Sequence, residues 1–255
     1  MLETPHRDPR DRFSDRVEDY VRYRPGYPVE AIEFVIRETG LKPGAVIADI
    51  GSGTGISAAM FLGKGYQVYA VEPNDPMREA AERLLADHAD FHSVKGSAEH
   101  TTLADGSVDL IVAAQAFHWF DTPETRAEFS RILKPDGRVA LIWNERLTAS
   151  TPFLRDYEQL LLSHGTDYAK VRHENVDHEA ISRFFRGGWR QAVFPNSQSF
   201  DFGGLQGRLL SCSYAPPAGH PGHEPMLAEL GRIFDLHQSG GRVRFDYDTR
   251  VYLGR

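Results

Sequence analysis

Short apolar runs alternate with helical patterns between residues 45 and 143, and this alternation limits the chain to few folds. Five runs are predicted to be strands: residues 45–50, 67–71, 91–95, 108–113 and 138–143. The clearest helix follows the second run, where apolar residues recur at helical spacing from Met77 after an expected Asp75 N-cap and Pro76. Strands that alternate with helices in this way indicate a parallel sheet with helices on both faces.

The flanking regions have a looser pattern. Residues 29–36 carry apolar side chains at helical spacing, and Gly40 and Pro43 are expected to end that helix. Further elements are predicted beyond residue 146: helices near residues 152–163 and 222–238, and strands at residues 189–194 and 243–253. We find no internal repeat and no low-complexity linker, so we expect one α/β domain with a helical elaboration.

Composition argues against several classes of partner. Hydrophobic residues make up 41% of the sequence and the net charge is −7, whereas nucleic-acid-binding domains usually carry a basic patch. A single cysteine, Cys212, is typical of a reducing compartment. Apolar runs are too short to span a bilayer, and the polar segment from Met1 to Arg12 does not resemble a secretory signal. We therefore expect a cytoplasmic monomer or homodimer with no nucleic-acid and no membrane partner.

Glycines follow the first predicted strand in the segment Asp49-Ile50-Gly51-Ser52-Gly53-Thr54-Gly55. Glycines let a backbone turn sharply and approach a ligand closely, and the helix that follows aims free amides at it. Glu72 ends the next strand, where a carboxylate can accept both hydroxyls of a ribose. The dinucleotide fingerprint requires glycine where Ile56 stands, and Asp49 suits a cationic amino-acid moiety better than a pyrophosphate.

These motifs resemble, in order and spacing, those of class I S-adenosylmethionine-dependent methyltransferases across residues 12–145. The resemblance is carried by the glycine segment, Glu72, Gly96-Ser97-Ala98-Glu99 and Asp109-Leu110-Ile111-Val112. Two further segments resemble the methyltransferase type 11, trans-aconitate methyltransferase-like branch: Tyr20-x-x-x-Arg24-Pro25-x-Tyr27-Pro28 and Phe117-His118-Trp119-Phe120-Asp121. The resemblance implies a Rossmann-like, seven-stranded, mostly parallel sheet with helices on both faces and a helical cap elaboration. Within this single domain we expect a lid arm at residues 1–28, a cofactor-binding core at 29–145, and a substrate-side elaboration with the final strands at 146–255.

The resemblance also implies which residues bind the cofactor: Tyr20, Arg24, Asp49, Gly51, Ser52, Gly53, Glu72, Pro73, Met77, Ser97, Ala98, Glu99, Ala114 and Gln115. Gly51 and Gly53 would flank its methionine part, and Glu72 would bind the ribose. Many relatives carry Asp where Ser97 stands, so the adenine amino group would be held more weakly or by Glu99. Met77 would lie against the adenine or only pack in the core. Tyr20 and Arg24 would close over the cofactor, with a surface arm packed on the sheet edge as the alternative.

Residues 117–121 follow the fourth predicted strand, at the edge where open parallel sheets bind ligands. His118 is predicted to bind the acceptor, and proton abstraction is the less favoured role. Trp119 and Phe120 would be apolar walls beside it or helix-entry packing. Aromatic residues of the tail either line the acceptor pocket or, as is more common, belong to the core: Trp189, Phe194, Phe200, Phe202 and Tyr214. The histidines are too scattered to indicate a metal, so none is expected.

The sequence favours methyl transfer to a small-molecule acceptor through an O-, N- or C-nucleophile, a carboxylate among them. A nicotinamide-dependent oxidoreductase is the alternative enzyme, and Ile56 argues against it. A non-catalytic cofactor-binding protein would carry the same glycine segment, so the motifs do not exclude it. A nucleic-acid methyltransferase is disfavoured by the net charge and by Gln115-Ala116-Phe117-His118, which stands where an Asn/Asp-Pro-Pro-Tyr-like motif would be expected.

Overall fold

A seven-stranded sheet runs through the computed structural model, which describes residues 17–117, 122–168, 178–185 and 188–255. The strand order is β3-β2-β1-β4-β5-β7-β6, and β7 is antiparallel to both of its neighbours. The strands are β1 (Val46–Ile50), β2 (Gln67–Val71), β3 (Phe91–Val94), β4 (Val108–Ala114), β5 (Leu133–Arg146), β6 (Arg190–Phe200) and β7 (Val243–Gly254). The predicted mostly parallel α/β sheet is therefore confirmed.

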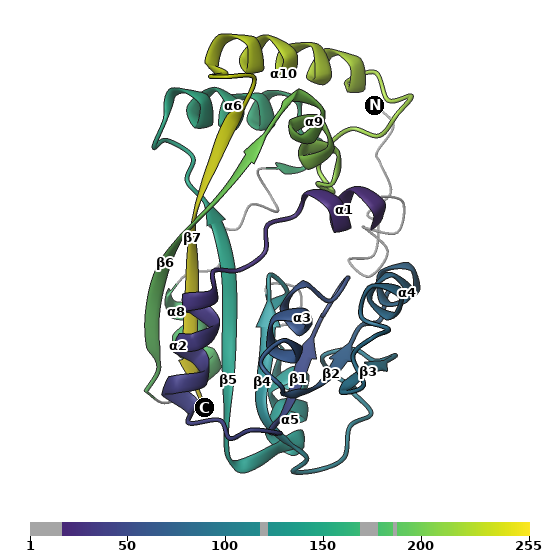
Figure 1. Ribbon diagram of the computed structural model, residues 1–255, viewed down its shortest axis with the longest axis vertical. Helices are drawn as coiled ribbons and strands as arrows, with labels where there is room; N and C mark the ends of the chain where they lie inside the picture. The colour runs from purple at the N-terminus through teal and green to yellow at the C-terminus, as the bar shows by residue number, and fades with distance from the viewer. Residues whose placement is uncertain (1–16, 118–121, 169–177, 186–187) are drawn as a thin grey trace.

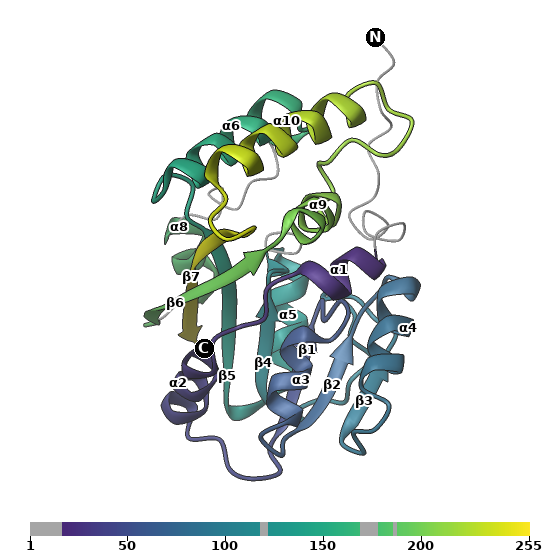
Figure 2. The ribbon, with the colours of Figure 1, turned by 45° about the horizontal axis from the view of Figure 1, so that its top comes forward.

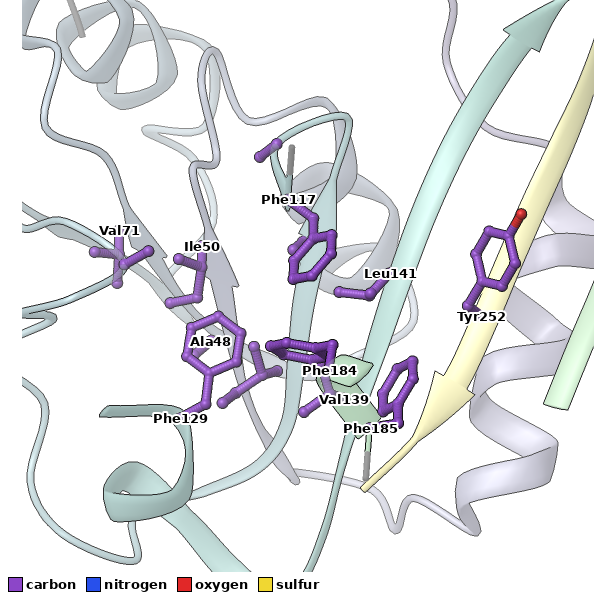
Figure 3. Close-up of a cluster of buried hydrophobic side chains, with 14 of the residues drawn as sticks. Ala48, Ile50, Val71, Phe117, Phe129, Val139, Leu141, Phe184, Phe185 and Tyr252 are labelled. Atoms are coloured by element: carbon purple, nitrogen blue, oxygen red, sulfur yellow. The ribbon is translucent and has the colours of Figure 1, made fainter. Parts of the chain in front are cut away.

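Helices lie on both faces of the sheet (Figure 1). They are α1 (Val17–Tyr23), α2 (Val29–Thr39), α3 (Ile56–Leu62), α4 (Asp75–Leu84), α5 (Pro123–Ile132), α6 (Pro152–His164), α8 (His178–Phe185), α9 (Phe202–Leu210) and α10 (His223–His237). On one face, α2 and α3 bury residues such as Ile32 and Phe61 against the sheet. On the other face, Phe129 of α5 and Phe184 of α8 pack with Leu141 and Tyr252 (Figure 3). No helix in the described ranges is both long enough and apolar enough to cross a membrane.

Local signals explain where several helices begin and end. Gly40 ends α2 in the left-handed conformation, with φ of 63°, and the side chain of Thr122 caps α5. The expectation for α4 was wrong by one residue: Asn74 is the N-cap, and its side chain accepts the Met77 N–H at 3.0 Å. Asp75 is instead the first helical residue and pairs with Arg78.

The second half of the sheet is longer than the first, and the sequence did not predict this. Strands β5, β6 and β7 have 14, 11 and 12 residues, whereas β1 and β2 have five each. The long strands extend beyond the carboxyl ends of β1 and β4 and carry α6, α9 and α10 (Figure 2). Tyr157 of α6 and Phe245 of β7 lie in the separate apolar cluster under these helices. Helices α1 and α9 were not predicted, and α1 contacts both α9 and α4.

Candidate functional site

The glycine segment forms a tight loop between β1 and α3. Gly51, Gly53 and Gly55 all have positive φ, at 67°, 56° and 84°, a conformation that other residues rarely adopt. The amides of Gly51 and Ser52 both donate to the Val71 carbonyl, at 2.9 and 3.2 Å, which fixes the loop to the end of β2. A side chain at Gly55 would meet Leu85 at 2.7 Å, so the loop packs against α4 without room for a Cβ.

Glu72 is held in place by the backbone on both of its carboxylate oxygens. Oε2 accepts the Gly53 N–H at 2.8 Å, and Oε1 accepts the Asn74 N–H at 2.8 Å. The residue is buried, and burial raises its pKa. Each oxygen keeps a free lone pair, so the carboxylate can still accept hydroxyl donors from a ligand.

Asp49 lies under the same loop and is fully buried. Ser57 Oγ donates to its Oδ2 at 2.6 Å, while Oδ1 has no hydrogen-bond partner in the described part of the chain. Burial raises the pKa of Asp49 to about 7, and the nearby charge of Glu72 adds to this effect. Among the described residues, Asp49 forms no ion pair with a lysine or an arginine. A cationic ligand would therefore stabilise this pair of buried acids.

Other predicted cofactor residues surround the loop. The Cε of Met77 would lie 3.4 Å from a Cβ on Gly53, so this buried side chain lies directly against the loop. Ser97 and Ala98 follow β3 in a turn in which the Ser97 amide donates to the His100 carbonyl at 3.1 Å. Glu99, in the same turn, is exposed. Pro73 lies between Glu72 and the N-cap of α4.

Gln115 follows Ala114 at the carboxyl end of β4 and has an unusual backbone. Its φ is 58°, a left-handed conformation that costs energy for a residue other than glycine. Its Nε2 donates to the Asn144 carbonyl at 3.1 Å, and its buried Oε1 has no partner among the described residues. Gln115 thus offers a fixed hydrogen-bond acceptor just beyond the carboxyl end of β4.

Asn144 connects the arm to the sheet, and sequence reasoning missed it. Its Nδ2 donates to the Gly26 carbonyl at 3.0 Å, and its Oδ1 accepts from Thr249 and Asn196 at 2.5 and 3.1 Å. Asn196 donates to the same Gly26 carbonyl at 2.8 Å. No periodic pattern marks a residue whose partners lie on three distant segments.

A cavity of about 60 Å³ lies where the arm, the carboxyl ends of β4 and β5, and helix α9 come together. Tyr20 and Arg24 line it, with the Arg24 guanidinium 4.8 Å from the centre of the Tyr20 ring. Ile56 and Gln115 also line the cavity. We use the name core wall for these two residues together with the glycine loop, Asp49 and Glu72, which belong to the same site but do not themselves line the cavity. A second group of lining residues comes from the cap region, and we call it the cap wall: Arg146, Tyr168, Arg208, Tyr214 and Tyr247.

Of the five tail aromatics considered for the acceptor pocket, Tyr214 lines the cavity. The others lie elsewhere: Phe200 in the apolar cluster with Tyr157 and Phe245, Trp189 and Phe194 against the two faces of the sheet, and Phe202 38% exposed. Arg146 and Arg208 were not predicted, because nothing in their local sequence distinguishes them from surface arginines. Within the described ranges, no group of histidine, cysteine and acidic side chains is arranged to hold a metal ion.

The expected acceptor residues His118 and Trp119 lie outside the described residues, as do Phe120 and Asp121. Phe117, immediately before them, is buried, and its ring lies edge-on to those of Trp143 and Phe184, at centroid distances of 6.0 and 4.6 Å. The chain therefore enters this segment from a fixed position at the end of β4 (Figure 3).

Comparison with known proteins identifies relatives of the chain. The family model of the methyltransferase domain matches residues 48–141. An uncharacterized methyltransferase of Mycobacterium tuberculosis is 37% identical over 134 residues, and the match spans about half of each protein, 52%. An uncharacterized methyltransferase of Schizosaccharomyces pombe is 33% identical over 247 residues, which cover 94% of this chain and 95% of the relative.

Two solved structures share the fold. A candidate type II methyltransferase of Anaeromyxobacter dehalogenans superposes with a TM-score of 0.67 at 23% identity, over 91% of this chain and 98% of the other. A candidate methyltransferase from an antibiotic biosynthesis pathway of Anabaena variabilis gives a TM-score of 0.64 at 23% identity, over 92% and 98%. At these identities, the likeness concerns the arrangement of the chain and not its acceptor.

Proposed function

The chain belongs to the class I S-adenosylmethionine-dependent methyltransferases, and we propose that it transfers the methyl group of this cofactor to a small-molecule acceptor. The buried acids of the core wall carry the proposal. Glu72 is fixed by two backbone amides, and Asp49 Oδ1 is buried without a hydrogen-bond partner among the described residues. A ligand with a cationic amino-acid part and a ribose diol supplies both kinds of missing donor.

The residues of the core wall fit such a ligand part by part. Glu72 would accept the ribose hydroxyls, and Ser97 with Ala98 would meet the adenine edge beside Met77. The unpartnered Oδ1 of Asp49 and Oε1 of Gln115 would accept from its ammonium group, directly or through water. Arg24, whose buried Nε has no hydrogen-bond partner in the described ranges, would bind its carboxylate.

When bound, the cofactor supplies an electrophilic methyl carbon, which an acceptor lone pair attacks in line while the electrons of the breaking carbon–sulfur bond remain on sulfur. The task of the chain is therefore alignment and exclusion of water, and good alignment can lower a barrier by about 7–11 kcal/mol. Tyr20, Arg24 and Tyr27 line the cavity from the arm and would cover the reacting groups. Only a protonated nucleophile needs a base, and we propose that His118 binds the acceptor in the first place.

Ligand binding tests the first half of the proposal. S-adenosylhomocysteine at 100 times its dissociation constant should raise the free energy of unfolding by about 2.7 kcal/mol, measured by thermal or chemical unfolding. NADH should have no effect. A folded protein whose unfolding is unchanged by millimolar S-adenosylhomocysteine would contradict the assignment.

Turnover tests the second half. Screening carboxylates, phenols, amines and enols for release of S-adenosylhomocysteine should identify an acceptor, and His118→Ala should then reduce turnover or acceptor affinity while cofactor affinity is retained. Full activity of His118→Ala on that acceptor would limit His118 to support of the loop. Binding without turnover on any acceptor would favour the cofactor-binding protein.

A further inference from the structure

The single cysteine of the chain lies next to two residues that line the cavity. Cys212 follows the end of α9, and its side chain is completely buried. Arg208 Nη1 donates to its Sγ at 3.0 Å, and the Tyr214 side chain forms a second hydrogen bond with the sulfur. Arg208 and Tyr214 both line the cavity. The sulfur is therefore one side chain away from the cavity, and the proposed function does not use it.

Two guanidinium groups act on this sulfur, those of Arg208 and Arg24. Arg24 Nη2 donates to the carbonyl of Ser211, the residue before Cys212, at 3.0 Å. Burial acts to raise the pKa of the Cys212 thiol, but the two guanidinium groups and the hydrogen bonds outweigh it and lower that pKa to about 7. Much of the sulfur is thus thiolate at neutral pH, and the thiolate is the form that reacts with oxidants.

One hydrogen-bond donor of Arg208 is not used. The residue is 7% exposed, and its buried Nε has no hydrogen-bond partner in the described part of the chain. Nε belongs to the same planar guanidinium group whose Nη1 contacts the sulfur, so the unused donor is held close to Cys212. A buried donor without an acceptor is unfavourable, and an oxygen atom bonded to the sulfur would supply an acceptor beside this group.

The size of the cavity indicates which oxidant reaches the sulfur. Its volume of about 60 Å³ is several times the roughly 10–15 Å³ that a single water molecule needs on the same measure. Hydrogen peroxide is a small polar molecule only a little larger than water, so it fits this space. The cysteine of a second protein does not reach a sulfur that is 0% exposed. The chain has no second cysteine, so oxidation of Cys212 does not continue to an internal disulfide.

We propose that Cys212 is a site of reversible oxidation by hydrogen peroxide, and that the sulfenic acid formed there weakens cofactor binding. The thiolate attacks one peroxide oxygen, and the O–O bond breaks as the S–O bond forms. The leaving hydroxide takes up a proton and becomes water. The sulfur loses two electrons, and the peroxide gains the same two. Two equivalents of a small thiol restore the cysteine, with release of water and of the thiol as its disulfide.

The effect on the cofactor rests on the proposed function, in which Arg24 binds the cofactor carboxylate. The new oxygen adds volume to a completely buried site and offers an acceptor to the nearby guanidinium groups. Arg24 is held next to Cys212 by its contact with the Ser211 carbonyl, so the oxygen competes with the cofactor carboxylate for Arg24. We expect the affinity for S-adenosylhomocysteine to fall roughly tenfold, which corresponds to the loss of one hydrogen bond to a charged group.

Chemical trapping tests the site itself. The folded protein would be treated with hydrogen peroxide and then unfolded in the presence of dimedone, which forms a stable adduct with sulfenic acids. Mass spectrometry should find this adduct on the peptide that contains Cys212. Cys212→Ser is the control: it should form no adduct, and it should bind S-adenosylhomocysteine as the untreated wild-type protein does. If the folded wild-type protein forms no adduct, the inference is overturned.

Substitution of Arg208 tests why this cysteine reacts. Arg208→Gln removes the charge beside the sulfur and should slow adduct formation roughly tenfold, because less of the thiol is ionised. Arg232→Gln is the matched control, because it removes the same charge from the exposed surface of α10, where Arg232 pairs with Glu229. Its rate should not change. If Arg208→Gln does not fold, Arg208→Lys keeps the charge but loses the planar fork, and it should also react more slowly. An unchanged rate in the folded Arg208 variant overturns the inference.

Calorimetry tests the effect on the cofactor. Oxidised wild-type protein should bind S-adenosylhomocysteine roughly tenfold more weakly, and dithiothreitol should restore the affinity. Oxidation of Met77 is the competing cause, because this side chain lies against the glycine loop. Methionine sulfoxide resists dithiothreitol and would also form in Cys212→Ser, so an equal loss of affinity in that variant overturns the inference. An adduct without any change in affinity overturns the effect on the cofactor. If the untreated wild-type protein does not bind S-adenosylhomocysteine, the proposed function fails instead, and trapping still tests Cys212.

Discussion

The core wall and the cap wall of the cavity bury charges of opposite sign. Asp49 and Glu72 belong to the core wall, and Arg146 and Arg208 form part of the cap wall. Each group is costly to bury alone, because burial removes its hydration. The same low dielectric strengthens its attraction to a partner of opposite charge. The two walls therefore bury charges of opposite sign, and a ligand group of the other sign would stabilise each of them.

The two walls also differ in how the chain builds them. Glu72 of the core wall bonds to Gly53 and Asn74, all within 22 residues of one another. The cap wall takes Arg146, Tyr168, Arg208, Tyr214 and Tyr247 from four separate regions. The arm joins the two walls through Tyr20 and Arg24, and Arg24 Nη2 also donates to the Ser211 carbonyl beside Arg208 at 3.0 Å.

The largest expected effect is on the core wall, from Glu72→Ala. Loss of a charged acceptor should weaken S-adenosylhomocysteine binding by about 1.5–3 kcal/mol, measured by calorimetry, and the freed Gly53 amide should loosen the loop as well. Glu79→Ala, on the exposed face of α4, is the control and should bind normally. Unchanged affinity of the Glu72 variant would show that the cofactor does not contact this wall.

The next largest effect concerns the arm, which lies between the walls. A Cβ on Gly207 of α9 would lie 2.0 Å from the Tyr23 ring, so Gly207→Ala should displace α1 and cost about 1–3 kcal/mol of unfolding free energy. Gly203→Ala is a matched control on the same helix, because its Cβ would have only a contact of 3.8 Å with Asp201. It should be neutral or slightly stabilising. Equal stability of both variants would mean that the arm is not packed on α9.

Weaker cofactor binding in Gly207→Ala would further support the arm as part of the site. The lid behaviour expected for residues 1–28 stays a prediction. Its described end is fixed by Gln198, whose Nε2 donates to the Tyr23 carbonyl at 3.1 Å, and by the contacts of Asn144 and Asn196 with Gly26. Any closing motion would therefore have its largest amplitude in the residues before Tyr23. Hydrogen exchange of the arm amides, compared with and without S-adenosylhomocysteine, would measure it.

The core wall is built from residues close in the sequence and the cap wall from distant ones, and this difference explains which parts the sequence could predict. Strand periodicity, helix caps and a glycine-rich turn are local, so the five core strands and the loop with Glu72 were recognisable from short windows. The N-cap of α4 was misplaced because Asn74 and Asp75 are both good capping residues, and the choice depends on Glu72 holding the Asn74 amide.

The cap wall was not predictable in the same way. Helix α9 carries Gly203, Gly204 and Gly207, which lower helix propensity, and only packing against its neighbours explains it. Arg208 becomes distinctive only when β7 and α6 bury it among tyrosines. A buried arginine and an exposed one look identical in a single sequence.

The pH dependence of cofactor binding should give a smaller effect. Burial raises the pKa of Asp49 to about 7, and an ammonium ligand requires the ionised form. Affinity for S-adenosylhomocysteine should therefore fall by up to about tenfold for each pH unit below 7, and calorimetry should detect proton release. Asp49→Asn should bind more weakly at pH 8 and lose this dependence. A pH-independent affinity in the wild-type protein would contradict the assigned contact.

In the ligand-free protein, the contribution of Asp49 to stability changes with pH in the opposite direction to the cofactor affinity. A pKa that is higher in the folded than in the unfolded state means that the folded protein binds more protons between about pH 4 and 7. The contribution of Asp49 to unfolding free energy is thus fully present below that window and is lost as the pH rises through it. Asp49→Asn should flatten the decline.

The smallest effect tests whether the walls are independent. Thr249→Val removes the hydroxyl that donates to Asn144 Oδ1 at 2.5 Å, but leaves the Asn196 donor in place, so it should cost about 0.5–1.5 kcal/mol of stability. Asn144 contacts Gly26 and Gln115 through other atoms, its Nδ2 and its carbonyl, and cofactor affinity should therefore stay within about twofold. A loss of affinity as large as that of Glu72→Ala would show that Asn144 couples the two walls, and the acids and arginines would then have to be treated as one network.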